Sequence, residues 1–183
     1  MTSFIIKAHE KRARNTEWAS NDDCVFCRIL NNEKSSSVVY EDEQVIAFLD
    51  ILPLRRGHTL VIPKVHIPRL SDLPPEYASA LGMAVSKVAK ALTQALDNTG
   101  LNVVCNQDYA QAVPHVHYHI IPAPLLNTWN ITDPDPNAER KQQESKEPGS
   151  DTKKMHQMEF EARMGEMDVE DAEELAKLIR AKL

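Results

Sequence analysis

The stretch His115-Val116-His117-Tyr118-His119, which continues into Ile120-Ile121-Pro122, carries three histidines at alternate positions near the middle of the chain. Side chains of a strand point to opposite faces in turn, so a strand here places all three imidazoles on one face. Three such rings stabilise a fold poorly, because each loses water or needs a hydrogen-bond partner when it is buried. They suit the binding of an anion, attack on phosphorus or the holding of a metal.

Composition narrows the class of protein around this stretch. The chain has 183 residues, 42% hydrophobic and 26% charged, which predicts one main globular domain with room for extensions. The formal charge of −6 argues against general nucleic-acid binding. We expect neither a transmembrane helix nor a secretory signal, and hence no membrane partner. The cysteines Cys24, Cys27 and Cys105 do not suggest a disulfide scaffold, so the cytoplasm or the nucleus is the expected location.

Hydrophobic patterns predict five strands and one long helix in the first two thirds of the chain. We expect the helix to be capped by Asp72 and to end at Gly100. The order of these elements predicts an α+β domain, an antiparallel sheet with the helix on one side. The expected strands are 38–40, 45–50, 59–62, 101–105 and the histidine stretch itself.

Four segments are predicted from shifts in composition: an N-terminal arm over 1–20, the domain over 21–126, a flexible acidic and polar linker over 127–158, and a C-terminal amphipathic helix over 159–183. In the last segment Asp168 is a good N-cap for an apolar stripe. We expect this helix to dock on its own domain or on a partner.

The first candidate site is a metal site. Cys24 and Cys27 form a Cys-x-x-Cys pair that presents two thiolates to one zinc ion, although two half-buried cysteines beside Phe26 are an equally good interpretation. No second such pair follows. The remaining ligands would therefore be distant histidines, for which His66 and His115 are candidates, and the site would be structural.

The histidine stretch has three interpretations of its own. Three surface histidines at alternate positions are improbable in a chain with 7 histidines. A single metal bound by all three is disfavoured, because alternate residues of a strand lie about 7 Å apart. The third interpretation is a neutral imidazole that attacks phosphorus, flanked by groups that stabilise the charge of the phosphate.

The chain resembles the histidine-triad superfamily, whose signature is His-x-His-x-His followed by small or apolar residues. Further matches lie in order along about 100 residues. They are Cys24-Val-Phe-Cys-Arg-Ile, Ala47-Phe-Leu-Asp-Ile51, Gly57-His-Thr-Leu-Val-Ile-Pro-Lys-Val-His66, and Gln111 four residues before His115. Within the superfamily the chain is most similar to the nucleotide-binding, phosphoramidase-like branch, and its acidic C-terminal helix is similar to fungal members.

The resemblance implies a five-stranded antiparallel sheet with two helices, and a homodimer. It implies that His117 attacks the α-phosphate of a purine nucleotide substrate, an AMP or GMP derivative, and forms a covalent nucleotidyl-histidine that water hydrolyses. His119 would contact the phosphate, His58 would orient the cluster, and Gln111 would lie near the leaving group. It also implies a nucleotide site and a structural zinc site. The nucleotide residues would be Asp50 on the ribose, Ile51, Phe26, Ile29 and Leu49 around the base, and Asn106, Gln111, His117 and His119 near the phosphate; the zinc ligands would be Cys24, Cys27, His66 and His115.

The chain also departs from the pattern of this superfamily. The loop Asn106–Gln111 has no glycine and is about two residues shorter than usual, Ala112 replaces a common hydroxyl residue, and Ala123 replaces an arginine. We expect a hydrolase of nucleoside 5′-phosphoramidates. The alternatives are a dinucleoside polyphosphate hydrolase and a nucleotide-binding interaction protein with weak catalysis. A DNA-end repair enzyme is disfavoured, because the acidic tail has no cysteines for a zinc finger.

Overall fold

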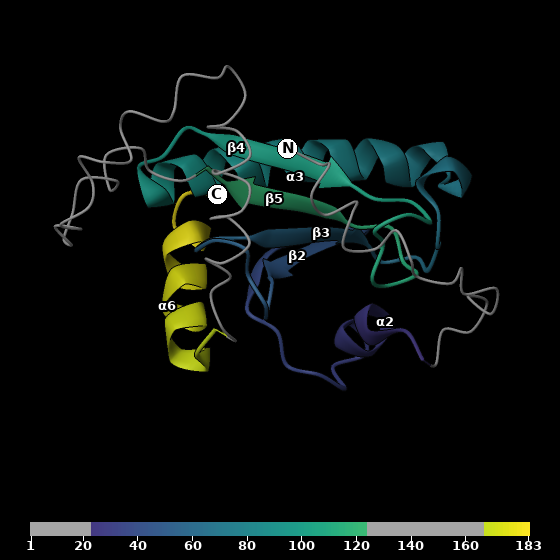
Figure 1. Cartoon of the computed structure of the whole chain (residues 1–183), viewed down its shortest axis with the longest axis horizontal. Helices are drawn as coiled ribbons and strands as arrows, with labels where there is room; N and C mark the ends of the chain where they lie inside the picture. Colours follow the sequence, from purple (N-terminus) through teal and green to yellow (C-terminus); the bar gives the residue numbers. More distant parts are fainter. Residues whose placement is uncertain (1–22, 124–166) are drawn as a thin grey trace, which may run out of the picture.

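The computed structural model describes residues 23–123 and 167–183 (Figure 1). In these residues the chain forms a five-stranded antiparallel sheet, three α-helices and one short 3-10 helix. The elements are α2 (Val25–Leu30), β1 (Val38–Glu41), β2 (Val45–Leu49), β3 (Thr59–Pro63), η1 (Leu70–Asp72), α3 (Pro75–Leu96), β4 (Leu101–Cys105), β5 (Tyr118–Pro122) and α6 (Val169–Arg180).

The strands of the sheet lie in the order β1-β2-β3-β5-β4. The turn from β1 to β2 is fixed by Asp42, whose carboxylate accepts hydrogen bonds from the backbone N–H groups of Gln44 and Val45. At the other side of the sheet β5 lies between β3 and β4, because the chain leaves β3, runs through α3 and returns as the edge strand β4. This order brings the histidine stretch to the interior of the sheet.

Alternation along the strands creates two apolar clusters, one on each face of the sheet. On β2, Val45, Ala47 and Leu49 pack with the buried residues of α3 and α6. The intervening Ile46 and Phe48 pack with α2 and its Phe26. The helices α3 and α2 therefore lie on opposite faces, as Figure 1 shows, and α6 packs against α3 and the β1–β2 side of the sheet.

The predicted helix is present, but its ends differ from the prediction. Asp72 belongs to η1 and does not cap α3; the N-cap is Pro74, and Pro75 occupies the first turn. Proline suits this place, since it has no N–H to leave unpaired. The helix ends at Asp97, which adopts the left-handed conformation with φ 48°, so Gly100 lies beyond the end. Asp97 thus takes the position in which a glycine is most common.

The histidine strand is shorter than predicted, because β5 begins at Tyr118 and contains only His119 of the three histidines. The backbone N–H of Val116 donates to Ile67 O, in the segment that follows β3, instead of extending the β3–β5 ladder. His115 and His117 therefore lie on the approach to the strand.

The predicted C-terminal helix is confirmed over Val169–Arg180, with Asp168 as N-cap accepting from the N–H of Glu170. The predicted arm, the linker and residues 159–166 lie outside the described residues. In the part of the chain that the structure describes, no helix combines the length and apolarity needed to cross a membrane.

Candidate functional site

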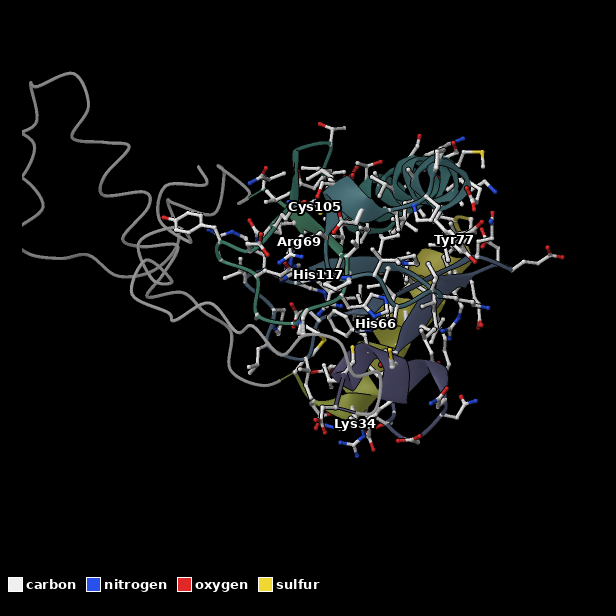
Figure 2. All side chains as sticks on the ribbon, turned by 90° about the vertical axis from the view of Figure 1, so that its right-hand side faces the viewer. Lys34, His66, Arg69, Tyr77, Cys105 and His117 are labelled. Carbon is white, nitrogen blue, oxygen red and sulfur yellow. The ribbon has the colours of Figure 1, made fainter. Side chains whose placement is uncertain are left out.

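Three histidines of the stretch gather on the α2 face of the sheet. His119 lies opposite Leu60 of β3 and Val104 of β4. The ring of His117 packs edge-on against His119, with centroids 4.8 Å apart, and against Phe26, with centroids 5.2 Å apart. Figure 2 shows where His117 lies among the side chains of this region.

His117 is held as a neutral imidazole with one nitrogen free to react. Its Nδ1 lies 2.6 Å from the carbonyl oxygen of His115, which only accepts, so Nδ1 carries the proton and Nε2 keeps its lone pair. Burial lowers the pKa of His117, although that carbonyl and Asp50 oppose the shift. The ring is therefore unprotonated at neutral pH, as a nucleophile must be.

His58 and His119 form a second hydrogen-bonded unit. The backbone N–H of Leu54 donates to Nδ1 of His58 over 3.2 Å, which leaves the proton of His58 on Nε2. Nε2 then donates to Nδ1 of His119 over 2.9 Å, so His119 carries its own proton on Nε2. Burial lowers the pKa of both rings. His119 is thus a neutral ring with an N–H donor.

Asp50 lies beside this unit at the end of β2. Its carboxylate is 3.4 Å from Nδ1 of His58 and accepts a hydrogen bond from the N–H of Leu52. The tight turn before His58 needs Gly57, whose φ is +86°, and a Cβ there would lie 2.7 Å from Cδ1 of Leu96. The loop between β2 and β3 therefore places a partly exposed carboxylate next to the histidines.

Gln111 is buried and lies next to the carbonyl of His115. Its amide nitrogen donates to Pro68 O over 2.8 Å and, over a long 3.4 Å, to the same His115 carbonyl that accepts from His117. Its amide oxygen accepts from the N–H of Asp108 over 3.0 Å. The amide expected near the leaving group is therefore engaged with the backbone. Asn106 is the first residue after β4 and begins this loop.

The residues expected around the base do not all share one face. Phe26 and Ile29 belong to the α2-side cluster, and Ile51 is 63% exposed on the loop after β2. Leu49 instead packs into the α3-side core, and Phe48 presents its ring to Phe26 at 5.7 Å between centroids. Alternation along β2 carried the signal that would have selected Phe48 over Leu49.

The four predicted metal ligands come together from three separate segments of the chain. Cys24, Cys27, His66 and His115 each offer an atom, and these atoms lie within 4.8 Å of one another. Nδ1 of His66 is 3.2 Å from Sγ of Cys27, and Nδ1 of His115 is 3.6 Å from Sγ of Cys24.

The chemistry of this set fits a tetrahedral zinc ion. His115 donates from Nε2 to Pro63 O over 2.9 Å, which leaves the lone pair of Nδ1 facing the thiols. Burial and the neighbouring Cys24 raise the pKa of Cys27 to about 12, so a cation is needed to hold it as a thiolate. Asp50, His58 and His119 also converge, but there the two rings already bond to each other.

The antiparallel sheet, the buried histidine cluster beside an aspartate and the separate Cys₂His₂ set indicate a protein whose site is built on clustered histidines. The HIT domain family model matches residues 31–124, and the chain belongs to this histidine triad family.

Named relatives support this membership. The chain is 44% identical over 103 residues to the Hit protein of Bacillus subtilis, covering 55% of this chain and 71% of that protein. It is 38% identical over 103 residues to an adenylylsulfatase of Arabidopsis thaliana, covering 55% of this chain and 52% of that protein.

Solved structures agree with the fold. A Zn-bound histidine triad protein from Mycobacterium smegmatis superposes with a TM-score of 0.61 and 30% identity, covering 89% of this chain and 94% of that one. A hypothetical histidine triad nucleotide-binding protein from Sulfolobus tokodaii superposes with a TM-score of 0.64 and 32% identity, covering 87% and 91%.

Proposed function

We propose that this protein hydrolyses purine nucleoside 5′-phosphoramidates, with His117 as the nucleophile. The observation that supports this most directly is the hydrogen bond from Nδ1 of His117 to the carbonyl of His115, which leaves Nε2 as a buried, neutral and unprotonated nitrogen. Membership of the histidine triad family adds to this support.

In the first step Nε2 of His117 attacks the α-phosphorus, the P–Nε2 bond forms and the P–N bond to the leaving amine breaks. The amine leaves with a proton taken from solvent water, and the proton is returned to solvent when water is consumed in the second step. Positive charge develops on the imidazole, and the His115 carbonyl on Nδ1 stabilises that charge. His119 donates from Nε2 to a phosphate oxygen.

In the second step water attacks the same phosphorus, the P–Nε2 bond breaks and the nucleoside monophosphate leaves. Asp50 accepts hydrogen bonds from the ribose hydroxyls, since its carboxylate is partly exposed beside His58. The base would pack against Phe26, Ile29 and the exposed Ile51. Leu49, in the α3-side core, would support the loop after β2 that carries Ile51. Asn106 and Gln111 border the phosphate end.

We also propose that Cys24, Cys27, His66 and His115 hold a structural zinc ion. The zinc would join α2 to the segments before and after α3, and it would supply no reacting group. The Zn-bound relative from Mycobacterium smegmatis supports this assignment. The protein would act as a homodimer, and the position of β4 at an edge of the described sheet supports pairing of two chains there.

The test is intact-protein mass spectrometry after brief incubation with adenosine 5′-phosphoramidate. We expect an adenylyl adduct on the wild type that His117→Ala abolishes, followed by release of AMP. His66→Ala is not a suitable control, since it disturbs the metal set; Leu178→Ala, on the exposed side of α6, serves instead. No adduct and no AMP, despite measurable AMP binding, would leave a nucleotide-binding interaction protein with weak catalysis.

A second candidate differs only in the leaving group. Because the amide of Gln111 is engaged with the backbone, a substrate with a leaving group that needs little assistance is favoured. The adenylylsulfatase relative suggests adenylyl sulfate, and a dinucleoside polyphosphate is the other alternative. Comparing kcat/KM for the three substrates on the same preparation decides among them, and the phosphoramidate must be fastest if the first proposal holds.

A further inference from the structure

The loop between β4 and the histidine stretch combines two unusual features. It contains no glycine, yet Asp108 and Ala110 both have φ 56°, in the left-handed region where glycine is favoured. A non-glycine residue is less stable in this conformation than glycine, and alanine tolerates it less well than aspartate. Contacts with the rest of the fold therefore help to hold these two residues in place.

Three side-chain contacts tie this loop to the segment that follows β3. Nε of Arg69 lies 3.0 Å and 3.2 Å from the two carboxylate oxygens of Asp108. The amide oxygen of Gln107 accepts from the N–H of Ser71 over 2.9 Å. Gln111 donates to the carbonyl of Pro68. Arg69 is the only charged partner in this set.

The same contacts lead to the nucleophile. Asp108 donates its N–H to Gln111, and Gln111 donates to the His115 carbonyl. That carbonyl accepts a hydrogen bond from Nδ1 of His117 and so fixes which nitrogen of the ring can react. Figure 2 shows Arg69 and His117 in the same region of the molecule.

We propose that the Arg69–Asp108 ion pair is a clamp that positions the glycine-free loop and, through Gln111, the reactive ring of His117. Arg69 is on this account a positioning residue that does not touch the substrate, and Gln111 transmits its effect to the His115 carbonyl. The ion pair stabilises the positive-φ conformation of residue 108, which a glycine would adopt without steric cost. The proposal rests on the proposed nucleotidyl transfer for its kinetic consequence, but its structural consequence is independent of it.

The kinetic test is a double-mutant cycle with Arg69→Met, Asp108→Asn and the double variant. Each single variant should lower kcat about three- to tenfold with little change in KM, because misplacement of a reacting group acts on the transition state. The double variant should be no slower than the worse single one, since both remove the Arg69–Asp108 contact. Arg69→Met also removes the longer pair of Arg69 with Asp72, at 3.9 Å, and is therefore expected to be the worse of the two. Arg69→Lys should recover part of the loss.

A glycine gives a sharper test of the strained backbone. Replacing Asp108 with glycine also removes the ion pair, but it lets residue 108 adopt positive φ without help. The variant Arg69→Met with Asp108→Gly should therefore be faster than Arg69→Met with Asp108→Asn. Equal rates, or a slower glycine variant, would contradict the clamp.

The matched control is Arg28→Met. Arg28 pairs with Glu33 over 3.4 Å and its side chain is 45% exposed, against 46% for Arg69, but it belongs to α2 and its partner Glu33 is not in the loop. Both variants should have similar melting temperatures. Only Arg69→Met should change kcat.

Amide hydrogen exchange separates failure of the clamp from failure of the proposed function. In Arg69→Met the amides of 107–111 should exchange at least about threefold faster, and in Arg28→Met they should not. Faster exchange without any nucleotide hydrolysis in the wild type would support the clamp and refute the function. Unchanged exchange, with hydrolysis intact, would refute the clamp alone.

Discussion

The histidines of the cluster differ in which ring nitrogen carries the proton, and the backbone decides this for each ring. Carbonyl oxygens accept from Nε2 of His115 and from Nδ1 of His117. The free nitrogen of His115 therefore faces the cysteines, and the free nitrogen of His117 remains for chemistry. Neighbouring residues of one type obtain different roles from the acceptors around them.

Burial of neutral histidines makes the protein sensitive to acid. The pKa of His58 and of His119 is lowered by burial, so below about pH 6.5 the unfolded chain binds protons that the folded chain does not. The free energy of unfolding should fall as the pH drops from 7.5 to 5.5, by about 1 kcal/mol for each such ring. Urea unfolding at the two pH values measures this.

The variant His119→Gln isolates one ring in that experiment. It removes a group that titrates only in the unfolded chain, so its stability should fall less between pH 7.5 and 5.5 than that of the wild type. Metal-free samples keep zinc release out of the comparison. Equal falls for the two proteins would show that His119 titrates normally in the fold.

Gly57 offers a residue-scale test of the turn that places His58. Gly57→Ala should lower the free energy of unfolding by about 1–3 kcal/mol, because φ is +86° and the new Cβ would lie 2.7 Å from Leu96. Gly82→Ala is the control: this residue lies inside α3 with nothing within 4 Å of the added carbon. It should gain up to about 1 kcal/mol. Chemical denaturation of both variants measures the change in the free energy of unfolding, which should be negative for Gly57→Ala and positive for Gly82→Ala.

At the level of elements, alternation and turn residues predicted the strands well, since each strand has a buried face that fixes its register. The ends of α3 were less predictable. Asp72 looks like a cap in sequence, but η1 already uses it, and Asp97 ends the helix before Gly100. Long-range contacts decided the start of β5, because the partner of Val116 is Ile67, far away in sequence.

In the candidate site, too, some features could be predicted from the sequence and others could not. Residue type and spacing predicted the convergence of the Cys₂His₂ set, because few atoms can serve as zinc ligands. Spacing could not reveal that Gln111 faces backbone carbonyls or that Arg69 reaches Asp108, since both contacts bridge segments about forty residues apart and depend on packing.

The helix α6 lies outside the matched family model, yet its apolar stripe completes the α3-side core. Ile179 is fully buried, and Leu178 beside it is 44% exposed. Arg180 also donates to the carbonyl of Val38 on β1. The contacts of this helix make it part of the domain and not an appended tail.

Ile179→Ala should therefore lower the free energy of unfolding by about 2–4 kcal/mol, through the cavity it leaves. Leu178→Ala should change it by less than about 0.5 kcal/mol. Thermal and urea unfolding monitored by circular dichroism compare the two. Similar losses, or none, would show that α6 does not contribute to the cooperative core.

At the scale of the whole molecule, the Cys₂His₂ set joins parts that the sheet does not join. α2 is short, with six residues, and has few buried side chains of its own. A bound zinc would fix it to the segments that carry His66 and His115. Zinc analysis should find about one ion per chain, and chelation or Cys27→Ser should lower the melting temperature by several degrees. Cys105→Ser, outside the set, should retain the metal; protein prepared without chelators that contains no metal would contradict the assignment.

The edge of the sheet raises the last whole-molecule question. Among the strands that the structure describes, β4 pairs only with β5, and exposed edge strands invite pairing with another chain. Val103 on this strand is 43% exposed, almost the same as Leu178 on α6, at 44%. If the protein is a homodimer paired through β4, Val103→Glu introduces repelling charges at the interface and should shift sedimentation toward the monomer. Leu178→Glu adds the same charge at equal exposure on a different element and should leave the dimer intact. A wild type that sediments as a monomer at micromolar concentration rules out the dimer, and an equal response of the two variants places the interface elsewhere than β4.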